Sequence, residues 1–228
     1  MRIKSVDLAY QIREMGIKKE GREIHINWRF KEATHFLVFL YDSRREFVLE
    51  EVLREIAESG LTDEDIVHSP QKKVYSGKKD SLKVFCVREK EFVKNGKKFS
   101  IMANEAKRGV PCTIAVYVCR YDEEEGGLSV YEPSGRENEV FLPITIEPEI
   151  RYKKVGLLPG NKKRMCILRL PYIEEYRDGA IMYHIDGIET DFPLPSGCLG
   201  KDIVIMIPVK SEVCIRIREE YRKYYKKV

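Results

Sequence analysis

Few side chains in this sequence are spaced as a metal site would require. The histidines are scattered, and none is followed within about four residues by a second histidine or a cysteine, the spacing of many zinc sites. The cysteines include no Cys-x-x-Cys pair. We therefore expect no metal site and no cofactor. The residues concerned are His25, His35, His68 and His184, and Cys86, Cys112, Cys119, Cys166, Cys198 and Cys214.

Acidic residues occur in two clusters that could supply the paired carboxylates of a glycosidase. These clusters are Asp63-Glu64-Asp65 and Asp122-Glu123-Glu124-Glu125. A glycosidase needs two carboxylates on facing elements of a cleft, whereas consecutive acids in a turn are usually solvated. His25 could meet a carboxylate across a sheet, but a surface histidine is the favoured interpretation. No residue is therefore assigned a catalytic role.

Two short motifs resemble ligand-binding loops. Asp42-Ser43 follows an apolar strand, as in the metal site of von Willebrand A domains, but the next residues, Arg44-Arg45-Glu46, break that pattern. Ser43 and Glu46 form a capping box, which explains them as the start of a helix. Ser76-Gly77-Lys78 lacks the upstream glycine of a phosphate-binding P-loop, so we expect a solvated turn.

The C-terminal residues 216–228 interleave basic and tyrosine side chains. Such a segment could bind single-stranded nucleic acid by charge and stacking. A solvated terminus that packs one or two tyrosines is the favoured alternative, and we expect truncation after Glu219 to leave the fold intact. The residues are Arg216, Arg218, Tyr221, Arg222, Lys223, Tyr224, Tyr225, Lys226 and Lys227.

Charge and hydropathy exclude several classes of protein. The 41 lysines and arginines against 37 acidic residues give a net charge of +4, far from that of a dedicated nucleic-acid binder. The first residues contain no continuous apolar segment of a signal peptide, and the longest apolar runs, 36–41 and 203–207, have the length of strands. We expect no membrane span, a reducing cytoplasmic compartment and free thiols. The alternative is a secreted protein whose leader has been removed.

The stretch from Pro111 to Tyr121 is apolar on both alternating faces and predicts a buried inner strand. Residues 3–12 could form an edge strand or a helix, and residues 23–30 alternate so clearly that one face must be exposed to solvent. A helix is predicted at 44–58, and Thr62 with Asp65 forms a second, smaller capping box. Further strands are predicted at residues 35–41, 81–93, 97–102 and 128–131, with hairpin turns at Asn95-Gly96 and Gly126-Gly127.

A polar, turn-rich stretch at residues 133–138 predicts a domain linker. The first domain would comprise residues 1–135 and the second, with the basic tail, residues 138–228. The second domain shows six strand signals and a hairpin turn at Asp186-Gly187. Its predicted strands are 141–152, 164–170, 180–185, 188–192, 203–208 and 213–217.

Three predicted strands resemble strands B, C and F of fibronectin type III or immunoglobulin-like domains. Their sequences are Ile-x-Ile-x-Trp-x-Phe, Phe-Leu-Val-Phe-Leu-Tyr and Thr-Ile-Ala-Val-Tyr-Val. Trp28 stands where such domains often keep a core tryptophan. The resemblance covers residues 20–132, and the second domain is similar only in being short and all-β. We predict a mainly β protein of two tandem β-sandwich domains, with the helix at 44–58 inserted in the first.

The resemblance implies adhesion, scaffolding or ligand presentation and no reaction. We therefore expect a non-catalytic, bacterial-type protein that binds a protein partner, with nucleic acid and membrane as unlikely partners. One alternative is a carbohydrate-binding accessory module, for which exposed tyrosines would form a platform. The other is an uncharacterised hydrolase, which would show two carboxylates, or a histidine beside a serine or cysteine, in a pocket. The candidate platform residues are Tyr10, Tyr75, Tyr131 and Tyr172.

Overall fold

The computed structural model describes residues 1–44, 46–69, 72–77, 81–106, 109–154, 163–173 and 176–227. Over these ranges the chain is mainly β-strand, as predicted, and its strands form several sheets. The chain divides into two units. The first comprises Met1–Lys107 and Pro111–Leu142, and the second comprises Arg108–Val110 and Pro143–Val228.

A seven-stranded sheet forms the middle of the first unit. Its strand order is β1-β9-β8-β4-β6-β5, and β10 also pairs with β8. The hairpin predicted around Gly126-Gly127 is confirmed, because β8 and β9 pair antiparallel. The strands are β1 (Arg2–Lys4), β4 (His35–Asp42), β5 (Lys73–Ser76), β6 (Leu82–Arg88), β8 (Cys112–Asp122), β9 (Gly127–Tyr131) and β10 (Glu139–Leu142).

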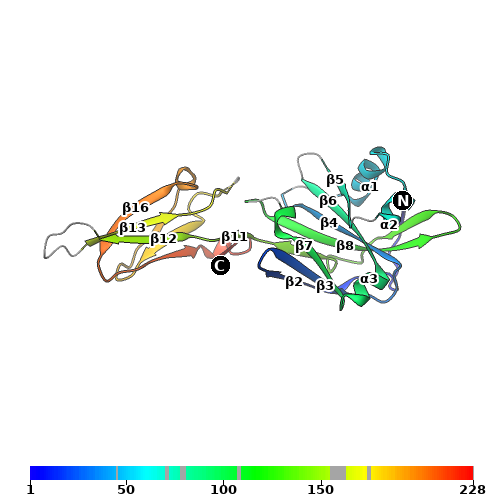
Figure 1. Cartoon of the computed structure of the whole chain (residues 1–228), viewed down its shortest axis with the longest axis horizontal. Helices are drawn as coiled ribbons and strands as arrows, with labels where there is room; N and C mark the ends of the chain where they lie inside the picture. The colour runs from blue at the N-terminus through cyan, green and yellow to red at the C-terminus, as the bar shows by residue number, and fades with distance from the viewer. Residues whose placement is uncertain are drawn as a thin grey trace. The chain divides into compact units, whose positions relative to one another are not determined.

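Both faces of this sheet are covered, so β8 is buried on both sides as its sequence predicted. Ile114 and Val116 pack toward a three-stranded sheet, and Ala115 and Tyr117 pack toward two helices. Figure 1 shows these helices on the opposite side of the large sheet from β2 and β3. The covering elements are β2 (Arg13–Glu20), β3 (Glu23–Arg29) and β7 (Lys98–Met102) on one face, and α1 (Leu49–Glu58) and α2 (Asp63–His68) on the other.

The alternation in β3 is also confirmed. Ile24, Ile26 and Trp28 are buried in the core between the two sheets, while the intervening residues face outward. The Trp28 ring stacks on Phe92 with 4.0 Å between centroids. Strand β1, by contrast, covers only residues 3 and 4 of the predicted 3–12 segment, and β2 was not predicted.

Helix α1 begins five residues later than predicted, and the Ser43/Glu46 capping box was wrong. The Ser43 amide donates to the Pro111 carbonyl oxygen, and its hydroxyl lies 2.8 Å from the Thr113 hydroxyl, so Ser43 stays attached to β8. The helix instead starts after Val48, without a side-chain cap. The smaller box at α2 is confirmed, because the Asp65 amide donates to the Thr62 hydroxyl and the Thr62 amide donates to the Asp65 carboxylate.

The hairpin predicted at Asn95-Gly96 was also wrong. Helix α3 (Glu89–Lys94) follows β6, and Asn95 is its C-cap. Gly96 adopts a φ of 68°, the left-handed conformation that ends many helices, so the same dipeptide chemistry serves a helix end here. Strand β7 then pairs with β3 rather than returning beside β6.

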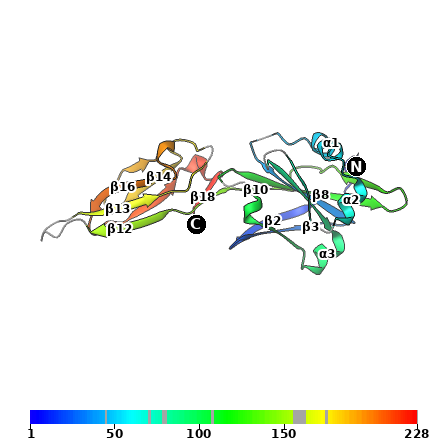
Figure 2. The ribbon, with the colours of Figure 1, turned by 45° about the horizontal axis from the view of Figure 1, so that its top comes forward.

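The second unit has two three-stranded sheets, β12-β13-β16 and β15-β14-β17, and a short β11-β18 pair. Leu168 and Ile203 of one sheet share a core cluster with Ile181 and Ile215 of the other. Figure 2 shows β12, β13 and β16 side by side. The strands are β11 (Ile144–Ile146), β12 (Glu149–Lys154), β13 (Lys163–Arg169), β14 (Ile181–Ile185), β15 (Asp191–Pro193), β16 (Asp202–Pro208), β17 (Val213–Ile217) and β18 (Tyr225–Lys227).

Two expectations about the second unit differ from the structure. The predicted boundary falls at residues 135–138, but β10 pairs with β8, so the first unit extends to Leu142. The basic tail packs one tyrosine, Tyr225, in the core as expected, but it also contributes a strand that was not expected, because β18 runs parallel to β11. Periodicity could not reveal β18, since the strand has only three residues.

Candidate functional site

The motif residues of the first unit have structural partners. The Asp42 carboxylate accepts hydrogen bonds from the Arg44 amide and side chain, with Nε 2.7 Å from Oδ1. Its neighbour Ser43 pairs with Thr113. The Gly77 amide donates to the Leu82 carbonyl oxygen, which continues the β5–β6 pairing, and Lys78 lies outside the described residues. These contacts give Asp42 and Ser43 structural roles.

The carboxylates of the acidic clusters also have structural partners. Asp63 accepts a hydrogen bond from the Leu128 amide and forms an ion pair with the amino group of Met1, at 2.7 Å. Asp122 accepts hydrogen bonds from the amides of Glu124 and Glu125, which closes the β8–β9 turn. Asp65 belongs to the capping box of α2. The contacts of these carboxylates hold turns and helix ends together.

The histidines of the first unit lie in two environments. His25 on β3 meets the Ser100 hydroxyl at 2.7 Å, and its Nε2 lies 3.3 Å from the Glu20 carboxylate on β2. This contact is the cross-sheet carboxylate that the sequence left as the less favoured alternative. Burial, and then the nearby positive charges of Arg88 and His68, lower the pKa of His35 to about 4. His35 is therefore neutral at physiological pH.

The second unit places a histidine, an aspartate and a cysteine in one row. His184 on β14 lies opposite Asp191 on β15 and opposite Cys214 on β17, so all three side chains share one face of the sheet. His184 Nδ1 is 2.9 Å from Asp191 Oδ1, and Arg216 Nη1 is 3.1 Å from the same oxygen. Cys214 makes no hydrogen bond to a described residue. The row therefore contains an imidazole oriented by a carboxylate, but its thiol is not hydrogen-bonded to that imidazole.

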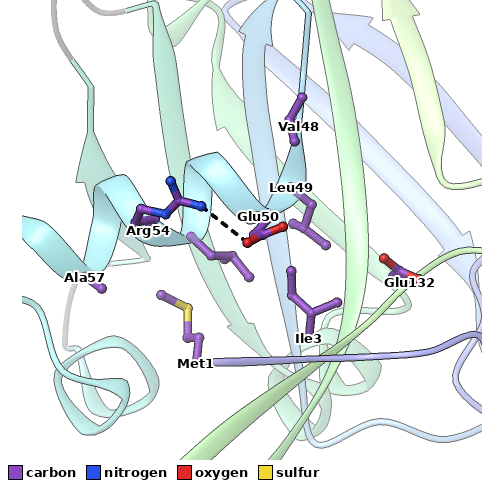
Figure 3. A pocket seen from close by; sticks show the side chains of 9 residues that line it. Met1, Ile3, Val48, Leu49, Glu50, Arg54, Ala57 and Glu132 are labelled. Carbon is purple, nitrogen blue, oxygen red and sulfur yellow. Dashed lines mark hydrogen bonds and ion pairs between the residues drawn. The ribbon is translucent and has the colours of Figure 1, made fainter.

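A groove of about 600 Å³ opens between α1 and β1 in the first unit. In Figure 3, Leu49 and Ala57 of α1, Ile3 of β1 and the preceding Met1 line it, with Glu132 nearby. The Glu50 and Arg54 side chains pair with each other at 3.2 Å along the helix. No histidine or cysteine lines the groove. It offers an apolar floor without an evident reactive group.

The edge strand β16 presents the largest exposed aliphatic side chains within any described strand. Val204 is 60% exposed and Met206 is 48% exposed, although both belong to a sheet whose other face is a core. Among the described strands β16 pairs with β13 alone, so one edge has free backbone donors and acceptors. The only charge in the strand, Asp202, is 3.5 Å from Arg151. An apolar and unpaired edge of this kind is rare in proteins that act alone.

The thiols divide by burial. All six cysteines are free. Burial raises the pKa of Cys86 to about 12 and raises those of Cys119 and Cys166. Cys112 and Cys119 lie in different core clusters, on opposite faces of β8 as predicted. Within the described ranges no group of three metal-ligating side chains is close enough to hold an ion, and no helix there is long and apolar enough to cross a membrane.

Neither known protein families nor curated proteins include a match to this sequence.

Sequence reasoning missed two features of the second unit, the exposed outer face of β16 and the row of His184, Asp191 and Cys214. The run Ile203 to Ile207 reads as a buried strand, and no local signal marks its outer face as exposed. The row of His184, Asp191 and Cys214 depends on strand register, because its members come from three strands. The hairpin predicted at Asp186-Gly187 joins two of them, because β14 pairs antiparallel with β15.

Proposed function

We propose that this chain is a non-catalytic protein-interaction protein and that it binds its partner through β16. The observation that carries the proposal is an edge strand whose outer edge pairs with no described strand and whose aliphatic side chains, Val204 and Met206, are exposed. Natural edge strands are usually protected by lysine, a bulge or a covering loop. In β16 Asp202 is the one charge, and it lies at the end of the strand.

The partner would supply an extended segment that pairs with β16 as a fourth strand of the β12-β13-β16 sheet. Main-chain hydrogen bonds would provide affinity, and alternate side chains would provide specificity. Met165 and Ile167 lie opposite Met206 and Val204 on β13, so an incoming apolar side chain would extend an existing stripe. Burying two such side chains contributes about 3 kcal/mol to binding before entropy is counted.

The fold that we propose for both units is an immunoglobulin-like sandwich, which suits this role. In the first unit β3 pairs with β7 while β4 pairs with β8, as strands B and E, and C and F, pair in such domains. In the second unit the orders β12-β13-β16 and β15-β14-β17 match A-B-E and C′-C-F. These domains commonly serve as interaction modules, although fold alone does not determine function.

A selection of random peptides displayed on phage, with the full chain as bait, tests the proposal. We expect enriched peptides with alternating apolar residues that bind wild type and lose binding to the Val204→Lys/Met206→Lys variant. The matched control is Val93→Lys/Met102→Lys, since these side chains are 43% and 45% exposed in the first unit. Self-association that only the β16 substitutions abolish would also support β16 as the binding edge, with a second copy of the chain as the partner. No enrichment without self-association, or equal loss in both variants, would exclude the proposal.

A thiol hydrolase is the second candidate, because His184 and Asp191 form an oriented pair opposite Cys214. Binding is better supported, since the pocket beside this row is lined by Asp191 but by neither His184 nor Cys214. Turnover of an ester panel that disappears in Cys214→Ala would favour the hydrolase. The carbohydrate alternative has less support. Tyr10 stacks on Tyr131, the Tyr75 hydroxyl donates to Glu55, and Tyr172 stands apart in the second unit.

A further inference from the structure

Most of the exposed large hydrophobic side chains of the second unit lie in or beside one strand, β16. Val204 and Met206 belong to the strand, and Val209, which is 48% exposed, follows it. Tyr172 is 67% exposed and lies against Gly200, just before the strand, where an added Cβ at the glycine would be 3.7 Å from the Tyr172 Cβ. Exposed apolar side chains therefore follow β16 from one end to the other.

The two outer edges of the β12-β13-β16 sheet differ in how they are protected. Charged side chains, lysine above all, keep edge strands from pairing with other chains. Strand β12, at one edge, exposes four of them, Glu149, Arg151, Lys153 and Lys154. Strand β16, at the other edge, carries only one charge, Asp202. A sheet with one protected and one unprotected edge joins one other sheet and then stops, so its association gives a closed pair and not a fibre.

The sequence of β16 is complementary to itself when two copies run antiparallel. About a two-fold axis at Ile205 all seven residues of the strand pair, and Val204 of each copy lies opposite Met206 of the other. The ends match as well, because the acid Asp202 begins the strand and the exposed Lys210 lies two residues beyond its end. In this register each aspartate comes beside the lysine of the other copy, at about the 7–8 Å spacing of diagonal neighbours that long side chains bridge.

Charge and proline placement both favour the antiparallel arrangement over a parallel one. A parallel pair in register would place Asp202 beside the same aspartate of the second copy, and like charges directly opposite each other destabilise a sheet. Pro208 has no N–H to donate, but it is the last residue of the strand. In the antiparallel register it lies at the outer end of the pair, where the hydrogen bonds of the central residues are unaffected.

We infer that the partner of β16 is a second copy of this chain. The inference rests on the proposed function, since it names the strand that the β16 edge binds. Two β16 strands pair antiparallel about a two-fold axis and join two three-stranded sheets into one of six strands. Standard complexes bury about 20–30 residues a side, whereas β16 offers seven. The dimer is therefore weak and reversible.

Sedimentation equilibrium of the full chain over a wide range of concentrations tests the inference. We expect the mean mass to rise with concentration from 26.7 kDa toward twice that value. Asp202→Lys and Lys210→Asp should each weaken the dimer by about tenfold, because each places like charges together at both ends of the strand pair. An equimolar mixture of the two variants should recover the wild-type affinity, since the introduced lysine then meets the introduced aspartate. The matched controls on β12, Glu149→Lys and Lys154→Asp, make the same changes of charge and should dimerise as wild type.

Three results would overturn the inference. The first is a mass of 26.7 kDa at every concentration. If a displayed peptide still binds wild type through β16 in that case, the proposed function stands and only the second copy is excluded. The second is equal weakening of the dimer by the β16 and the β12 substitutions, which would make the effect one of net charge. The third is a mixture that dimerises as weakly as either β16 variant alone, which would exclude the antiparallel pair. Failure of both dimerisation and peptide selection would remove the proposed function as well.

Discussion

At the scale of single residues, His35 gives the clearest pH dependence. Its pKa falls from 6.5 to about 4 in the folded protein, through burial and then through Arg88 and His68. The unfolded chain therefore binds more protons between these values, so this histidine stabilises the fold above about pH 6.5 and the contribution is lost as pH falls toward 4. We expect His35→Gln to flatten the decline in unfolding free energy over this window. Urea titrations at several pH values measure it, and an unchanged slope would contradict the assignment.

Thiol chemistry is the second property at this scale. We predict no disulfide in the native protein, so titration after unfolding without reductant should find six free thiols. In the folded protein burial raises the pKa of Cys86 to about 12 and that of Cys119 above its usual range, so both should alkylate slowly. Cys198 and Cys214 are partly exposed and should react first. A time course by mass spectrometry tests the order of labelling. Rapid labelling of Cys119 would contradict its burial in the core.

At the scale of elements, the capping box of α2 has a measurable value. The Thr62 hydroxyl accepts a hydrogen bond from the Asp65 amide at 3.1 Å. Removing an N-cap side chain typically costs about 1 kcal/mol. We expect Thr62→Ala to lower the free energy of unfolding of the first unit by that amount, measured by denaturant titration. A change in the free energy of unfolding of only a few tenths of a kcal/mol would show that the buried side chains of Ile66 and Val67 hold α2 in place without its cap.

The C-terminal strand makes a stronger prediction, which corrects the expectation of a dispensable tail. Tyr225 is 3% exposed and packs with Ile144 and Ile215 in the core of the second unit. Truncating a buried aromatic side chain costs about 3 kcal/mol or more. Tyr225→Ala should therefore destabilise the second unit by that much, while Lys227→Ala should have little effect. Equal melting temperatures for Tyr225→Ala and wild type would instead support the original expectation that the tail is dispensable for the fold.

The elements that the sequence predicts well are those whose pattern is local. Strand β3 alternates, and β8 is apolar on both faces, because neighbouring layers cover one or both sides. Helix α3 was missed because Asn95-Gly96 has the chemistry of a hairpin turn and of a helix end alike. The exposure of Val204 depends on which strand lies beside β16, and no local pattern specifies a missing neighbour. The candidate site was therefore less predictable than the strands that form it.

At the scale of the whole molecule, we predict that the chain can be separated into two folding units. The structure favours a division after Leu142, because β10 belongs to the sheet of the first unit. A fragment of residues 143–228 should unfold cooperatively by itself. A fragment of residues 1–142 should be more stable than one of residues 1–135, which lacks β10. Equal stability of the last two would return the boundary to the stretch at 133–138, and unfolded fragments would mean one shared core.

The central claim is that this protein binds a partner strand at the free edge of β16. Hydrogen–deuterium exchange of the full chain, with and without a peptide selected by display, tests it most directly, because strand pairing slows exchange of the amides that become hydrogen-bonded. The account predicts that protection gained on binding concentrates in residues 202–208 and disappears in Val204→Lys/Met206→Lys. A peptide that binds with equal affinity to that variant, or that protects other segments and leaves residues 202–208 unchanged, would contradict it.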